Sequence, residues 1–565
     1  MEIFLFIFPL ISFFIFQFQK LKIKADILYG LNIFFMLLTF VLSIYIFIKI
    51  LNFNNNDPLY LYPIIKLDDL FLDWSLRFDL FVSSLIVFIT FIVLLLSIYS
   101  INFPENYMTN VKINSLSSFS IFSVMLLLTS NNLIQFFIGW YLLILSSYLL
   151  SNISENKNRI IDNSNIFFQN RISDLCFFLS LYFIYTFSNS TNFDVIFKSN
   201  GFENNISILN KDFSNFNIAI FILFFSFLLR CRQFYISNSK YDLLNINTSS
   251  YSLILYGLYL PVGLYFILRF LILTQSSLDY LNVLLILGST LTFIFSIFLI
   301  RSYSLKKLTI YIASAQFGIL LILVSLKLYS AVVFYFFIST ISLVILSLSF
   351  GIISSKLNNE QDIRKMGYLI IKCPSIFLFI LIGFVSLLGI PYFSGFYSNQ
   401  LIFFQSSLII EENYTLIFTY CVFYTFIISY VSFKIILIVF LGENNCNIHL
   451  YNKIEEGSYY LKFIIFVLSV FVIFLGWYFN NLFSGNFGEN LWRLVLVADT
   501  NFAINHDFND NQFLFEVRYI VCYFGIFLAF LNYLIIPKLG DNLRLKNNKL
   551  FKYYLKSFTS YDFNR

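Results

Sequence analysis

The sequence predicts an all-α polytopic membrane protein with about fifteen transmembrane helices, and three observations support this prediction. The 565-residue chain is 59% hydrophobic and only 12% charged, whereas soluble domains carry about 25% charged residues. Apolar runs of about twenty residues recur from end to end, each long enough to cross a hydrocarbon core as a helix. The basic residues gather in alternate loops. Together these features exclude a soluble globular domain.

The apolar runs follow one another along the whole chain. The first, 2–18, precedes three lysines and is predicted to be a span rather than a cleavable leader. Further spans are predicted at 28–51, 79–99, 281–300, 331–353, 415–441 and 514–537. Two less apolar stretches, 188–214 and 484–513, are predicted to be loops. One membrane domain therefore covers most of the chain.

The placement of charge predicts the orientation of the spans. Loops after the odd-numbered runs hold most of the bases: Lys20, Lys22, Lys24, Lys112, Lys157, Arg159, Arg232, Lys240, Arg301, Lys306, Lys307, Lys356, Arg364 and Lys365. Loops on the other side carry Asp57, Asp68, Asp69 and Asp194. The positive-inside rule then puts the N-terminus outside and the polar stretch 358–367, "NNEQDIRKMG", in a loop on the negative side.

Several functional classes lack their motifs in this chain. The six cysteines are scattered with no CxxC pair, so neither a disulfide framework nor an iron–sulfur site is indicated. His449 and His506 both fall in predicted loops. Because the chain holds no GxGxxG, P-loop or HExxH motif, nucleotide chemistry and metallohydrolase chemistry are not supported. No nucleic-acid partner is expected.

Ionisable residues within or beside the predicted spans are informative, because each costs a few kcal/mol at the centre of a bilayer. The candidates are Asp79, Arg171, Asp174, Arg230, Arg269 and Lys434. Arg269 is interpreted as snorkelling to the interface, whereas Asp79 and Lys434 stay open between snorkelling and a buried role. Arg171 and Asp174 lie three residues apart on one helical face, which favours a structural ion pair over ion transfer.

The stretch "LLGIPYFSGFYSNQ" at 387–400 predicts a break between two helical segments. Proline removes a backbone donor, and the freed groups need partners inside the protein. The residues of this predicted break are Gly389, Pro391, Ser394, Gly395 and Ser398. We expect Ser394, Ser398 and Asn399 to face the interior. Both a segment lining an ion path and an ordinary turn between spans fit this composition.

The motifs "FDLFVSSL", "TSNNLIQFFIGW", "LSSYLL", "NRISD", "SLKKLTIYIASAQFG", "NNEQDIRKMG" and "GIPYFSGFYSNQ" occur in this order. Over about residues 70–443, the chain thereby resembles the family of antiporter-like subunits 5 of respiratory NADH:ubiquinone oxidoreductase. The resemblance implies an antiporter-like fold with two inverted five-helix repeats, each containing a broken helix. It also implies a subunit of a proton-translocating enzyme with no redox chemistry of its own.

The chain departs from the family at the positions that carry protons. These proton-path positions hold Tyr141, Arg230, Ser339, Leu343 and Asn399 in place of glutamate, histidine or lysine, and two further histidine positions hold Ser237 and Leu255. Leu343 and Asn399 cannot titrate, and the guanidinium of Arg230 is a fixed charge. A tyrosine hydroxyl such as that of Tyr141 titrates at about pH 10 in the reference state, and burial would raise this value further. The sequence therefore predicts an interrupted proton path.

Three functions remain open at this point. The chain is either a membrane-arm scaffold, the same subunit still pumping through substituted residues and water, or a free-standing cation/proton antiporter of Mrp type. The resemblance implies the mitochondrial inner membrane as location, with FMN, iron–sulfur clusters and ubiquinone elsewhere in the complex and no cofactor in this chain. The implied partners are the neighbouring antiporter-like subunit 4, accessory subunits or a separate lateral-helix chain, and lipids.

The expected organisation has four parts: N-terminal transmembrane helices at 1–70, the antiporter-like core at 71–443, C-terminal helices with a polar loop at 444–537, and a basic amphipathic tail at 538–565. The family continues into a lateral helix that this chain is expected to lack or to receive from another polypeptide. We expect the tail to pack against another chain, the alternative being a tail lying on lipid headgroups.

Overall fold

The computed structural model describes residues 2–17, 25–53, 58–67, 70–102, 107–153, 157–188, 190–198, 205–208, 211–230, 252–270, 278–407, 413–446, 448–452, 454, 456–484 and 512–535. The predicted tail 538–565, Ser237 and most of the predicted loop 484–513 lie outside these residues. Of Arg230 only the backbone is described, as the last residue of α8 (Asn215–Arg230).

The predicted polytopic helical class is confirmed. Within the described residues, eleven helices are long and apolar enough to cross a membrane, and two shorter apolar helices accompany them. The first half contains α1 (Phe4–Gln17), α2 (Ala25–Phe53), α3 (Leu80–Asn102), α4 (Tyr107–Leu128), α5 (Leu133–Ser151), α6 (Lys157–Ser188), α7 (Phe193–Lys198), α8, the π-helical segment η2 (Leu253–Tyr259) and α10 (Leu260–Phe270).

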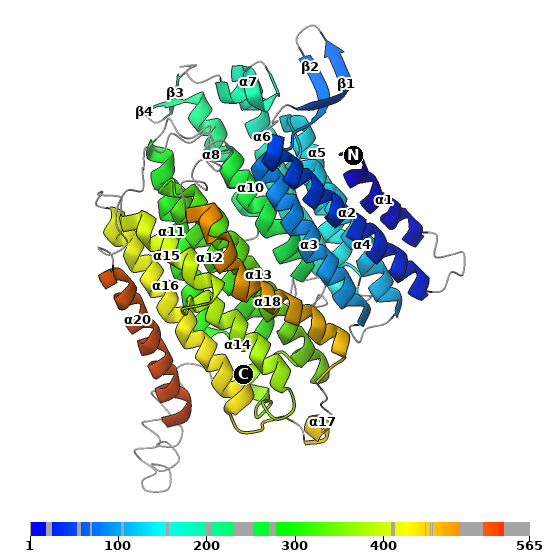
Figure 1. The fold of residues 1–565 in the computed structure, drawn as a ribbon. Helices are drawn as coiled ribbons and strands as arrows, with labels where there is room; N and C mark the ends of the chain where they lie inside the picture. The colour runs from blue at the N-terminus through cyan, green and yellow to red at the C-terminus, as the bar shows by residue number, and fades with distance from the viewer. Residues whose placement is uncertain are drawn as a thin grey trace.

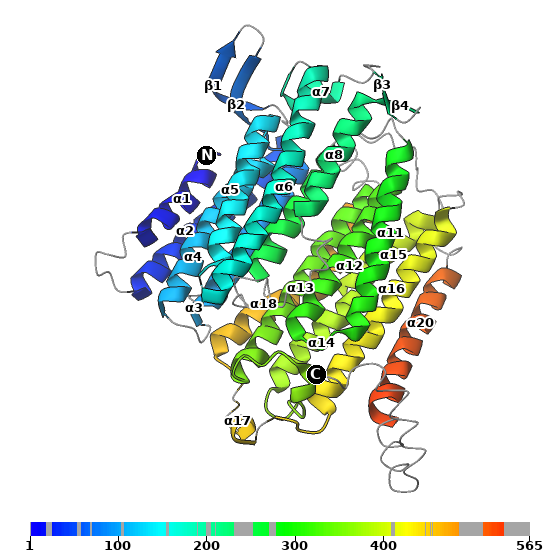
Figure 2. The same cartoon turned by 180° about the vertical axis from the view of Figure 1, so that it is seen from behind.

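The second half follows the same pattern of long helices. It contains α11 (Leu278–Arg301), α12 (Leu305–Ser325), α13 (Tyr329–Lys356), η4 (Ile363–Lys365), α14 (Pro374–Leu388), α15 (Ser394–Ser407), α16 (Asn413–Ile435), η5 (Ile436–Leu441), α17 (Ile448–Asn452), α18 (Tyr459–Ser484), α20 (Gln512–Phe530) and η7 (Leu531–Ile535). Figures 1 and 2 show α1 to α6 on one side of the molecule and α11 to α16 on the other, with α20 on the outer flank.

Two short β-hairpins accompany the helices. Strand β1 (Leu59–Leu67) pairs antiparallel with β2 (Leu70–Leu76), and β3 (Asn205–Ile208) pairs with β4 (Lys211–Ser214). Both stand at the end of the molecule that carries the N-terminus (Figure 1). The alternating tyrosines and leucines that begin β1 suit a strand whose side chains project to both sides. The hairpins lie in the connections between helices and leave the helical core unchanged.

The polar stretch 358–367 is a surface loop, as predicted. It contains η4, and the carboxylate of Asp362 accepts a hydrogen bond from the backbone N–H of Arg364 at 3.1 Å. The side chains of Arg364 and Lys365 are 54% and 60% exposed. Backbone bonds from Leu305 to Gln361 and from Ile363 to Tyr303 hold the loop against the start of α12. The loop therefore closes the end of the bundle opposite the hairpins.

Helix α13 is the central element of the core. In its apolar window 94% of the residues are buried, whereas in the span Glu516–Tyr533 of α20 the share is 17%. Among the described residues, α20 therefore contacts the bundle along one narrow face, and most of its surface faces outward from the bundle.

Many buried serine hydroxyls bond within their own helix. On α4 the hydroxyls of Ser117, Ser120 and Ser123 donate to carbonyls three residues earlier, at 2.7–2.8 Å. On α13 Ser342 and Ser347 do the same. This local bonding satisfies a polar group without a partner on another helix.

Candidate functional site

A network of four charges lies at the hairpin end of the first half. Asp79 directly precedes α3 and is 4% exposed. It accepts hydrogen bonds from Arg77 Nε at 2.9 Å and from Arg269 Nη1, in the last turn of α10, at 2.8 Å. Arg77 also pairs with Asp194 of α7. Burial lowers the pKa of Arg77, but the carboxylates of Asp79 and Asp194 outweigh it and raise the pKa.

The interpretation that Arg269 snorkels to the interface is wrong. Arg269 is 8% exposed, and its guanidinium is compensated by the carboxylate of Asp79. A buried charge persists only when it is paired with good geometry, and this pair meets that condition. The network joins β2, α3, α7 and α10, so it fixes the hairpin end of the first half.

The pair of Arg171 and Asp174 lies on the flank of the bundle. Arg171 Nη1 lies 3.3 Å from Asp174 Oδ2, and the side chains are 33% and 6% exposed. The Arg171 guanidinium also lies 5.1 Å from the centre of the Tyr141 ring. Tyr141 itself is 38% exposed, so its side chain lies at the surface of the described chain. This flank of α5 and α6 is a surface available to lipid or to a neighbouring protein.

The helical structure is interrupted between α14 and α15. Helix α14 ends at Leu388, and Gly389 follows with φ of +69°, in the left-handed region that favours glycine. Helix α15 begins three residues after Pro391, at Ser394. Ser394 and Ser398 are fully buried and Asn399 nearly so, which places the polar side chains of the break in the interior.

Close packing at the break requires glycine at position 395. A Cβ atom at Gly395 would lie 1.6 Å from the carbonyl oxygen of Ser386 on α14. A Cβ at Gly476 of α18 would lie 2.3 Å from Ser394 Cα. The first turn of α15 is therefore pressed against both α14 and α18, and the geometry of the break is held from two sides.

Arg518 of α20 enters this break, and the sequence analysis did not single it out. It is 2% exposed, and its Nη2 donates to the carbonyl oxygen of Leu388 at 2.6 Å. Asn399 Nδ2 donates to Gly395 O at 2.7 Å. A Cβ at Gly389 would lie 2.5 Å from each of these two nitrogens, so Arg518 and Asn399 are immediate neighbours. The signal available in the sequence was an arginine within the apolar run 514–537.

Polar side chains from three other helices surround this point. They are Gln316 of α12, Tyr335 of α13 and Tyr424 of α16, and the Tyr424 hydroxyl faces both of the others. Within the part of the chain that the structure describes, the Gln316 amide and the hydroxyls of Tyr424 and Ser394 are buried without a well-formed protein hydrogen bond. A cavity of about 10 Å³ lined by Tyr335, Asn399 and Tyr424 adjoins them, close to the smallest volume that holds one water.

The remaining family positions are apolar or satisfied locally. Leu343 is fully buried in α13, and the Ser339 hydroxyl donates to the carbonyl of Phe336 at 3.2 Å. Leu255 lies partly buried in η2. The structure thus brings Asn399 to the break, keeps Leu343 and Ser339 on the neighbouring α13, and leaves Tyr141 on the flank.

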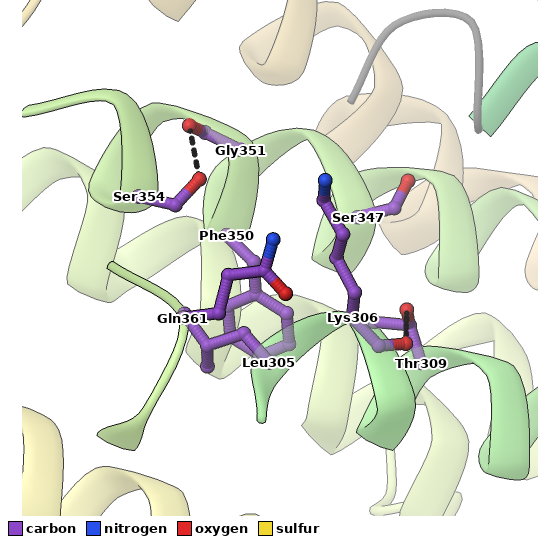
Figure 3. Close-up of a pocket in the computed structure, with 8 residues that line it drawn as sticks. All are labelled: Leu305, Lys306, Thr309, Ser347, Phe350, Gly351, Ser354 and Gln361. Carbon is purple, nitrogen blue, oxygen red and sulfur yellow. Dashed lines mark hydrogen bonds between the residues drawn. The ribbon is translucent and has the colours of Figure 1, made fainter. Parts of the chain in front are cut away.

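Two lysines mark the opposite end of the second half. Lys306 and Gln361 face a cavity of about 10 Å³ between α12 and α13, beside the surface loop (Figure 3). Lys434 of α16 is fully buried, and its Nζ donates to the carbonyls of Ile300 and Ser302 at 2.9 Å each. Of its two open interpretations the structure shows the buried one, because these carbonyls at the end of α11 accept the ammonium protons. Of these two lysines, Lys306 is the one that lines a water-sized cavity.

Metal binding has no support in the described residues, because no group of three His, Cys, Asp or Glu side chains is close enough to hold an ion. The described residues at the break offer hydrogen-bonding groups, the guanidinium charge of Arg518 and space for one water.

Comparisons with known proteins identify similar chains. The family model described as "NADH:quinone oxidoreductase/Mrp antiporter, TM" matches residues 130–429, which include the break. NADH-ubiquinone oxidoreductase chain 5 of Acanthamoeba castellanii is 28% identical over 85% of this chain and 72% of that protein. The chain 5 protein of Chondrus crispus is 27% identical over 78% of this chain and 68% of that protein.

Two solved structures share the fold. A chain of the Mrp complex from Dietzia sp. DQ12-45-1b aligns with a TM-score of 0.72 at 14% identity, covering 87% of this chain and 98% of that one. A chain of the membrane-bound sulfane sulfur reductase, an archaeal respiratory membrane complex, aligns with a TM-score of 0.69 at 15% identity, covering 87% and 95%. The predicted antiporter-like fold is confirmed.

Proposed function

The chain belongs to the NADH:quinone oxidoreductase/Mrp antiporter family, and from this premise we propose that it is the antiporter-like subunit 5 of a respiratory NADH–ubiquinone oxidoreductase. The observation that carries the proposal is the similarity to chain 5 proteins along 85% of the chain. The subunit resides in the mitochondrial inner membrane. Its partners are other membrane-arm subunits, in particular subunit 4, together with accessory subunits or a separate lateral-helix chain. The redox cofactors belong to other subunits.

Within the complex, the second half of this subunit acts as a scaffold rather than as a proton conductor. Asn399 and Leu343 stand where proton transfer requires groups that gain and release protons, and neither can titrate. The amide of Asn399 is already bonded to Gly395 O at 2.7 Å, and Arg518 beside it keeps a permanent charge. The alternative is pumping through substituted residues and water, for which Lys306 at its water-sized cavity offers one titratable base.

Membership in the complex is tested on native gels. A tagged form of the chain is expected to migrate in the band that shows NADH dehydrogenase activity. Migration of the intact tagged chain entirely apart from that band would contradict the proposal and favour a free-standing cation/proton antiporter of Mrp type. That alternative has less support, because the Mrp neighbour is similar in fold at only 14% identity.

The scaffold role is tested by the number of protons moved per NADH oxidised in sealed vesicles. We expect Asn399→Ala and Lys306→Met to leave this ratio unchanged, because neither side chain then carries protons. A lower ratio in Lys306→Met, with normal assembly and normal NADH oxidation, would instead assign the pumping role to this half.

A further inference from the structure

We propose that Arg518 is a fixed positive charge that seals the break between α14 and α15 against protons. The inference deepens the proposed function, on which it rests, by naming the residue that keeps the second half of the subunit from conducting. Arg518 acts as a positioning and electrostatic residue supplied by α20, a helix outside the matched segment 130–429.

The geometry places the charge of Arg518 at the interrupted end of a helix, where backbone carbonyls are left without partners. Where a helix is broken, the carbonyls of its last turn lose their partners within the helix. Arg518 Nη2 donates to one of these, Leu388 O, at 2.6 Å, in a site that excludes solvent from the side chain. Further carbonyls of this turn, those of Val385 and Ser386, accept from the N–H of Gly389. The guanidinium therefore caps the carboxyl end of α14.

The electrostatics of the break favour exclusion of protons. The carboxyl end of α14 carries about half a unit of negative charge that would attract a cation, and the full positive charge of the guanidinium outweighs it. Arginine does not release its proton, so the charge persists at any physiological pH. A unit charge about 6 Å away at an effective dielectric of 20 lowers the occupancy of an excess proton roughly a hundredfold. Fixed arginines exclude protons and cations from other pores by the same means.

Titratable side chains from three helices lie close enough to act on Arg518. Among the described residues, those with the largest electrostatic effect on it are Cys522 and Tyr519 of its own helix, Tyr335 of α13 and Cys421 of α16. The Leu387 and Ile402 side chains complete the cavity wall beside Asn399. A proton crossing the break by way of a water in this cavity therefore passes beside a permanent positive charge.

The test measures passive proton entry into sealed vesicles that carry the intact complex, without NADH. A potassium gradient with valinomycin drives protons inward, and an internal pH dye reports the rate. We expect Arg518→Gln to raise the rate of proton entry by roughly tenfold or more. The substitution removes the charge that lowers the occupancy of an excess proton by about a hundredfold. Arg301→Gln, the same change at an exposed arginine that ends α11, is the matched control and stays at the wild-type rate.

A second variant separates charge from shape. Arg518→Lys keeps a positive charge within reach of Leu388 O, but an ammonium in an apolar site can release its proton. We expect its rate to equal that of the wild type at acidic pH and to rise at alkaline pH, whereas the wild-type rate stays low throughout. A structural role alone would not produce this pH profile. The lysine variant also keeps the test valid if Arg518→Gln fails to assemble on native gels.

Two results would overturn the inference. One is an assembled Arg518→Gln complex with the wild-type rate of proton entry. The other is an Arg518→Lys rate that does not respond to pH. Because passive entry requires no NADH, either result leaves the proposed membership in the oxidoreductase to its own native-gel test, and failure of that test leaves the measured rates interpretable.

Discussion

At the residue scale, charges buried in pairs determine which substitutions the chain tolerates. Asp79 compensates Arg269 from a position 190 residues away in sequence. Removing one partner of a buried ion pair costs about 3–5 kcal/mol, because the other charge stays buried without compensation. We therefore expect Asp79→Asn to lower the thermal stability of the first half strongly. The double variant Asp79→Leu with Arg269→Met is expected to recover most of the loss, and an equally unstable double variant would contradict this account.

The carboxylate of Glu456 gives a pH-dependent prediction. Burial raises its pKa, but hydrogen bonds from Lys462 and the backbone N–H of Ser375 outweigh burial and hold the pKa below its usual range. A depressed carboxyl pKa stabilises the fold above the unfolded value of about 4.3, and this contribution is lost as the pH falls through the folded value. Glu456→Gln should therefore reduce thermal stability at neutral pH and leave it unchanged in strong acid. A pH-independent difference would refute the linkage.

Contacts between residues close in sequence could be predicted from the sequence, whereas contacts between distant residues could not. Arg171 and Asp174 are three residues apart, so helical geometry alone suggested that they could meet. The break was visible because Gly389 and Pro391 disturb a helix locally. Asp79 with Arg269, and Arg518 with Leu388, join segments distant in sequence. Spacing along the sequence does not predict such contacts, because they form only when the helices pack together.

At the element scale, close backbone contact between α14 and α15 maintains the geometry of the break between them. We expect Gly395→Ala to destabilise the second half, because the added methyl would meet Ser386 O at 1.6 Å and would push α15 away from α14. Limited proteolysis of the purified complex should reveal faster cleavage between α14 and α15. Gly30→Ala in α2 is the matched control, because nothing lies within 4 Å of its Cβ and alanine favours a helix by about 1 kcal/mol. Equal cleavage of both variants would show that the contact does not hold the break.

Helices were easier to predict than hairpins at this scale. A run of twenty apolar residues has few alternatives to a membrane helix, because hydrocarbon offers the backbone no other partner. The segments of β1 and β2 lie in a connection outside the helices, where strand and loop compete closely. The helical class of the fold was therefore predictable from the sequence, whereas the hairpin at 59–76 was not.

At the scale of the whole molecule, the basic and aromatic tail remains a prediction, since it lies outside the described residues. Its bases alternate with Phe551, Tyr553, Tyr554 and Phe558, which suits docking on an apolar surface with the charges in water. Deletion of residues 540–565 should produce a subcomplex that lacks the distal part of the arm on native gels. Normal assembly of the deleted form would instead favour a tail that rests on lipid headgroups.

The serine hydroxyls that bond within their own turn have an evolutionary consequence. A side chain satisfied inside its own helix makes no demand on the helix beside it. Such a position can exchange with other small residues without a matching change elsewhere, so neighbouring helices can diverge independently while their packing volume is conserved. We therefore expect substitutions to be least tolerated at sites such as Arg518 and Asp79, where one segment supplies a charge that contacts another segment.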